Sequence, residues 1–68
     1  MNDEALNITT RQFLKRFGIT AQREIERAIR ERIEEGKLAG TETLQVRATL
    51  AMPGVLDEVE IKGEISLQ

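Results

Sequence analysis

The sequence predicts an α+β fold in which two N-terminal helices pack on one face of a C-terminal antiparallel β-hairpin (α-α-β-β). Three observations predict it. Apolar residues recur with a helical period in the first half of the chain, and they alternate with polar residues in the second half. A Pro53-Gly54 pair interrupts the alternating half, as expected of a turn between two strands.

The stretch Thr20–Gly36 has the clearest helical pattern. At about 100° per residue its apolar side chains share one arc, and most of its charged side chains lie opposite. We expect the Thr20 hydroxyl to cap the first turn and Gly36 to end the helix in a left-handed conformation. The apolar arc comprises Ala21, Ile25, Ala28, Ile29 and Ile33.

Arg32 is the one residue that breaks this pattern, because it projects into the middle of the apolar arc. In one interpretation its aliphatic stem packs while the guanidinium reaches solvent near the helix end. In the other, the guanidinium is buried or held against a carboxylate or a bound anion. The sequence leaves both interpretations open.

Residues 3–17 are expected to form the first helix, with Asn2 or Asp3 as its cap. Gly18 is expected to end it, and Thr20 starts the next helix after a very short connection. One face of this first helix carries Leu6, Thr10, Phe13, Leu14 and Phe17.

The alternation in the second half predicts a strand over Leu44–Met52 and a second strand from Glu58 onward. The turn is expected at Pro53–Leu56. We expect the alternating apolar side chains of both strands to lie on one face of the hairpin. Gly63, which has no side chain on that face, is expected to mark a bulge or a close approach of a helix. The register that achieves this pairs Leu50 with Val59, Ala48 with Ile61, Val46 with Gly63 and Leu44 with Ile65.

The length of 68 residues is that of a single domain, residues 1–68, and a chain this short buries little of its surface. It has no cysteine, so no disulfide adds stability. We therefore expect the helices and the hairpin to share one core. Its expected members are Phe13, Phe17, Ile25, Ile29, Leu50, Val59 and Ile61.

The composition argues against an enzyme. Histidine, cysteine, tyrosine and tryptophan are all absent, which removes the commonest general base, the thiol nucleophile and the usual transition-metal ligands. The sequence has no glycine-rich phosphate loop. We interpret the acidic residues of the last strand as a solvated surface that protects a strand edge, and we expect no metal site and no cofactor.

Basic residues gather in the helical half. Residues 11–30 carry six basic and two acidic side chains, a net charge of +4, whereas residues 31–68 carry four basic and eight acidic ones, a net charge of −4. Ordinary solvation of helix surfaces explains this pattern, and a basic binding face for nucleic acid or an acidic partner is the functional alternative. The candidate face comprises Arg11, Lys15, Arg23, Arg27 and Arg30.

The same order of elements is also typical of part of a winged helix, with the hairpin as the wing. A preceding helix is missing, however, and the helix that would enter the groove carries five glutamates, which phosphates would repel. We therefore expect a small, non-catalytic interaction module with an unknown protein partner. A nucleic-acid-binding domain is the alternative.

No apolar run is long enough to span a membrane, and the N-terminus lacks the basic start and apolar segment of a signal peptide. We expect a cytoplasmic protein without membrane contact. The strand Leu44–Met52 carries only one charge, Arg47, so we also expect a weak homodimer through this hairpin edge at raised concentration.

Two motifs, RQFLKRFGIT followed by AQREIE, and EEGKLAG followed by TETL, resemble those of a small family of uncharacterised bacterial proteins, a domain of unknown function. The resemblance covers almost the whole chain. It implies a single domain, and it implies no activity, ligand or catalytic residue.

Overall fold

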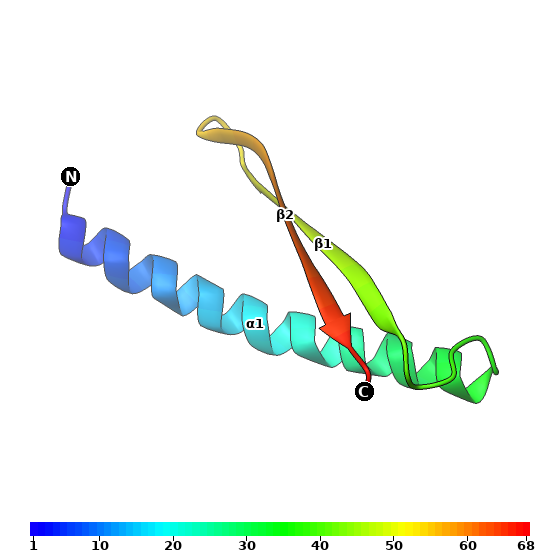
Figure 1. Cartoon of the computed structure of the whole chain (residues 1–68). Helices are drawn as coiled ribbons and strands as arrows, with labels where there is room; N and C mark the ends of the chain where they lie inside the picture. Colours follow the sequence, from blue (N-terminus) through cyan, green and yellow to red (C-terminus); the bar gives the residue numbers. More distant parts are fainter. The chain divides into compact units, whose positions relative to one another are not determined.

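The computed structural model describes residues 1–68 and contains one helix followed by a two-stranded antiparallel sheet (Figure 1). Helix α1 spans Asp3–Glu34, strand β1 spans Thr43–Met52 and strand β2 spans Leu56–Ser66. The chain divides into two compact units, Met1–Lys37 and Leu38–Gln68, which are described in turn.

The prediction of two N-terminal helices is wrong, because α1 runs through Gly18, Ile19 and Thr20 without a break. Gly18 is not among the glycines with a positive φ, so it does not adopt the conformation that would end a helix. A glycine inside a helix costs about 1 kcal/mol relative to alanine. Breaking the helix there would instead leave several backbone N–H and C=O groups without helical partners.

The ends of α1 explain its bounds. The Asn2 side chain accepts a hydrogen bond from the Ala5 amide at 3.0 Å, which confirms one of the two expected caps. Thr20 lies inside the helix and is not a cap.

At the C-terminal end of α1, Gly36 has a φ of 75°, and the Lys37 amide donates to the Arg32 carbonyl at 2.9 Å. This is a Schellman motif, so the prediction for Gly36 is confirmed.

The hairpin has the predicted register, including Leu50 opposite Val59 and Val46 opposite Gly63. The Val55 amide donates to the Met52 carbonyl at 2.9 Å, and Gly54 has a φ of 79°. With Pro53 in the preceding position, these features define a type II turn. Strand β2 starts at Leu56, which pairs with Met52, so it begins two residues earlier than expected.

The strands are regular except next to the turn. The pairing shifts between Leu50 and Met52, where Asp57 and Glu58 of β2 lie opposite the single residue Ala51 of β1. This is a bulge with its extra residue on β2. The register is regular at Gly63, which is therefore not a bulge.

The expected core residues are not buried; indeed no side chain of the chain is. Ile25, Ile29 and Leu50 are half-buried, while Phe13, Phe17, Val59 and Ile61 are exposed. Taken by itself, each unit has only one layer, and a side chain is buried only between two layers. Helix packing on the hairpin and a single domain over residues 1–68 stay predictions.

Candidate interaction surfaces

The most extensive candidate surface is a line of apolar side chains along α1. Their spacing repeats after 11 residues, as in Leu6, Phe17 and Ala28, and 11 residues at about 100° each return to within about 20° of the same direction. The line therefore runs nearly straight along the helix, within an arc of about 100° that also contains the charged residues Asp3, Glu24, Arg32 and Glu35. We call this surface the apolar stripe, and it comprises Leu6, Thr10, Leu14, Phe17, Ala21, Ile25 and Ala28.

The N-terminal half of the apolar stripe is open to solvent. Leu14 is 53% exposed and Phe17 is 46% exposed. Phe13 lies beside the stripe, and its ring stacks on that of Phe17 with centroids 6.3 Å apart. Large apolar side chains grouped in this way on a surface are typical of a site that binds another protein.

Arg32 is the next position of the stripe after Ala28 and is half-buried. Its Nε atom lies 2.8 Å from Glu35 Oε1, and its Nη2 atom donates to Glu35 Oε2 at 3.1 Å. Nη2 also lies 3.4 Å from Glu31 Oε2. Both carboxylates that contact Arg32 belong to its own helix, and the two interpretations of this residue stay predictions.

The candidate basic face lies on the side of α1 away from the apolar stripe. Arg11, Lys15, Arg23, Arg27 and Arg30 fall within about 160° of the helix circumference, but Glu26 lies inside the same arc. Arg27 pairs with Glu24 and with Glu31, and its Nη1 atom lies 3.2 Å from Glu31 Oε1. Because these carboxylates, Glu24 above all, hold the guanidinium in its charged form, they raise the pKa of Arg27.

The other four members of the candidate face make no ion pair. The structure thus places the five residues on one side of one helix but does not form an uninterrupted basic surface. Glutamates between the basic side chains weaken attraction to phosphates.

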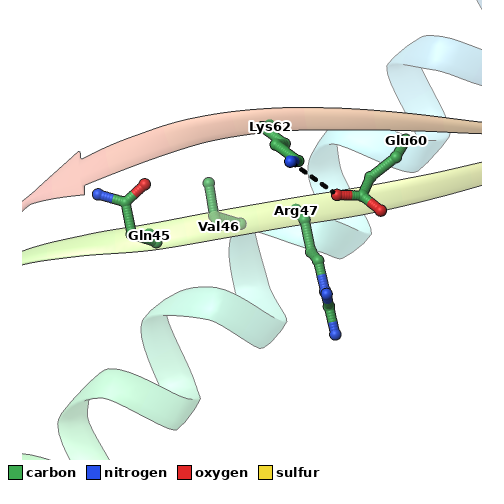
Figure 2. A pocket seen from close by; sticks show the side chains of 5 residues that line it. All are labelled: Gln45, Val46, Arg47, Glu60 and Lys62. Carbon is green, nitrogen blue, oxygen red and sulfur yellow. Dashed lines mark ion pairs between the residues drawn. The ribbon is translucent and has the colours of Figure 1, made fainter.

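The polar face of the hairpin carries a like-charge pair, because Arg47 lies opposite Lys62 in the register. Lys62 Nζ is 3.6 Å from Glu60 Oε1, and both residues border an open hollow of about 410 Å³. Figure 2 shows the Arg47 side chain extending away from this ion pair. The polar groups therefore do not converge on one point, as a small-molecule site requires.

The connection between α1 and β1 is organised by Glu42. Its carboxylate accepts hydrogen bonds from the backbone amides of Ala39 at 2.8 Å, Gly40 at 2.9 Å and Thr41 at 3.1 Å. These donors, Ala39 first, stabilise the charged carboxylate and lower the pKa of Glu42. The Glu42 carbonyl also accepts from the Leu67 amide at 2.9 Å, which joins the connection to the end of the chain.

The structure brings no three potential metal-ligating side chains together. α1 is long enough to cross a bilayer but too polar to do so, and no other helix is present.

The whole chain, residues 1–68, matches the family of unknown function DUF6494. The chain belongs to this family. Neither the curated proteins nor the solved structures include a match.

Membership of DUF6494 confirms the family resemblance but supplies no activity for any residue. An interpretation of the Gly18-Ile19-Thr20 segment as a helix boundary hides the continuity of the apolar stripe. The signal that reveals it is the 11-residue spacing across that segment: Leu6 with Phe17, Thr10 with Ala21, and Leu14 with Ile25. Such spacing belongs to one straight helix rather than to two.

Proposed function

We propose that this member of DUF6494 is a small, non-catalytic module that binds a protein partner through the apolar stripe of α1. The observation that supports the proposal is the exposure of Leu6, Leu14 and Phe17 along one side of a helix. Most helical stability in proteins comes from packing one apolar face of the helix rather than from the propensities of its residues. A partner that covers the stripe would stabilise α1 in this way.

Binding of nucleic acid is the second candidate. It is favoured by one segment of α1, residues 11–23, which contains Arg11, Lys15, Arg16 and Arg23 and no acidic residue. None of these four side chains makes an ion pair. Glu26 and Glu34 flank them further along the same side, so we rank this candidate below a protein partner.

The experiment that tests the proposed function is affinity capture with the full chain, followed by titration of each captured protein in purified form. Phe17→Glu places a charge in the apolar stripe and should abolish the complex. Ile19→Glu is the matched control, because Ile19 is 45% exposed against 46% for Phe17 but projects from the opposite side of α1. A partner that binds both variants as well as the wild type would exclude the stripe as the binding surface.

A further inference from the structure

We propose that the partner of the apolar stripe is the same stripe of a second copy of this chain, with the two α1 helices antiparallel and Ala21 at the two-fold axis. The inference rests on the proposed function, since it names the occupant of that surface. It follows from the spacing of the stripe, from the sizes of its side chains and from the distribution of charge along α1.

The spacing is symmetric about Ala21 over the positions from Thr10 to Arg32, which leave out Leu6, the first member of the apolar stripe, and add Arg32, the position after its last member. These positions are separated by 4, 3, 4, 4, 3 and 4 residues. An antiparallel two-fold pairing centred on Ala21 therefore places every one of these positions opposite another. The facing pairs are Phe17 with Ile25, Leu14 with Ala28, and Thr10 with Arg32.

The sizes of the side chains fit this pairing. The bulky Leu14 meets the small Ala28, and Phe17 meets Ile25, while the two copies of Ala21 allow the helices to approach closely. Alternation of large and small residues across an interface lets the layers interdigitate. A parallel pair would instead place Phe17 against Phe17 and Ala28 against Ala28, which crowds one layer and leaves another empty.

The charges of α1 also favour the antiparallel direction. Residues 11–23 carry four basic side chains and no acidic one, a net charge of +4. Residues 24–35 carry five glutamates and three arginines, a net charge of −2. Antiparallel helices bring the basic segment of each copy beside the acidic segment of the other, whereas parallel helices bring like segments together.

Arg32 shows how a charge is accommodated at the end of the stripe. Glu31 and Glu35 of its own helix hold the guanidinium, so its aliphatic stem is left to lie against Thr10 of the second copy. In a parallel pair the two copies of Arg32 would face each other, which like charges disfavour.

The first test is the mass of the purified full chain by sedimentation equilibrium. We expect a dimer for the wild type and for Ile19→Glu, and a dissociation constant raised on the order of 100-fold or more for Phe17→Glu, because each dimer loses two apolar contacts. A monomer at every concentration up to the millimolar range would overturn the proposal. A dimer that Phe17→Glu leaves intact but Thr49→Pro disrupts would also overturn it, because the hairpin edge would then be the interface.

The second test leaves the stripe unchanged and so does not depend on the folding of a stripe variant. The chain has no cysteine, so Ile8→Cys provides a single site for a spin label on the side away from the stripe. Antiparallel pairing about Ala21 separates the two labels by 26 residues of helix, about 39 Å along the axis. Parallel pairing would place the two labels at the same level along the axis, separated only by the width of two helices, about 20 Å. A distance distribution at the short value would exclude the antiparallel arrangement.

Cross-linking discriminates between the arrangements independently. A mixture of Leu14→Cys and Ala28→Cys chains should form disulfide-linked heterodimers on mild oxidation, while Leu14→Cys alone should stay unlinked. The opposite result would indicate parallel helices. The two proposals can also be told apart. If the purified chain is monomeric but the wild type captures another protein that Phe17→Glu no longer binds, the homodimer is excluded and the proposed function stands. If neither a dimer nor such a partner is found, both proposals are excluded.

Discussion

Val46 of β1 lies directly opposite Gly63 of β2, and a Cβ atom added to Gly63 would lie 3.6 Å from Val46 Cγ1. That distance is an ordinary van der Waals contact, so an alanine fits at position 63 without displacing its neighbour. The backbone of Gly63 is also not in the left-handed region. The glycine therefore leaves a gap on the apolar face of the hairpin that a methyl group would fill.

We predict that Gly63→Ala stabilises the hairpin by about 0.4–1 kcal/mol, because alanine has less conformational freedom than glycine in the unfolded chain. Urea unfolding followed by NMR signals of β1 and β2 measures the change. Gly54→Ala is the control: its φ of 79° makes the same substitution strained, so it should destabilise the hairpin. Destabilisation by Gly63→Ala would show that the face around Val46 cannot accept another methyl group.

Glu42 gives the connection before β1 a dependence on pH. Its pKa is lowered in the folded chain by the amides of Ala39, Gly40 and Thr41. In an unfolded chain the pKa of a glutamate is about 4.3. The stabilising contribution of the charged carboxylate is therefore complete above that ordinary value and is lost as the pH falls through the lower folded pKa.

We expect Glu42→Gln to destabilise the 38–68 unit at neutral pH and to reduce its loss of stability on acidification, since the group that titrates is gone. Unfolding measured by hydrogen exchange or urea between pH 7 and pH 2 tests this. Glu58→Gln removes one charge from an exposed residue of the same hairpin and serves as the control. Equal pH profiles for the wild type and Glu42→Gln would mean that the hydrogen bonds of Glu42 contribute nothing to stability.

Nucleic-acid binding by the basic side of α1 makes a separate prediction. We expect no binding, or only weak binding, to a labelled duplex at physiological salt, because Glu26 interrupts the face and Glu24 and Glu31 pair with Arg27. Fluorescence anisotropy at several salt concentrations measures it. A tight complex whose affinity falls steeply with salt and is weakened by Arg11→Gln or Arg23→Gln would reverse our ranking, since bound phosphates release counterions.

The register of the hairpin was predictable from the sequence, whereas the continuity of the helical half was not, for a physical reason. In β1 and β2 the period of two fixes which side chains share a face, and matching the apolar residues of the two strands gives their register. Pro53-Gly54 indicates where the chain turns, but the bulge beside the turn does not follow from the sequence. In the helical half, Gly18 followed by Ile19 and Thr20 has the local features both of a helix end and of a helix interior. Only the spacing of apolar residues across Gly18 discriminates between them.

The candidate surfaces were also predictable only in part. The positions of the basic residues around the helix follow from sequence spacing, but the contacts of Arg27 and Arg32 with particular glutamates require side-chain geometry. The membership of a shared core does not follow from the sequence, because apolar periodicity shows which face of an element is apolar and not which second layer covers it.

The last prediction tests the continuity of α1 itself. Gly18→Ala should stabilise the helix by about 1 kcal/mol, because alanine has the higher helix propensity and the Cβ atom it would add meets no atom within 4 Å besides the adjacent helix backbone. Gly36→Ala should have the opposite effect, since Gly36 has a φ of 75° and ends the helix in a conformation that alanine adopts only with strain. Circular dichroism during thermal unfolding measures both, and hydrogen exchange at the amides around residue 18 locates the change. If α1 were two helices joined at Gly18, that glycine would need the same left-handed conformation as Gly36. Gly18→Ala would then lower helix stability as Gly36→Ala does, and opposite signs for the two variants are therefore the result expected of one continuous helix.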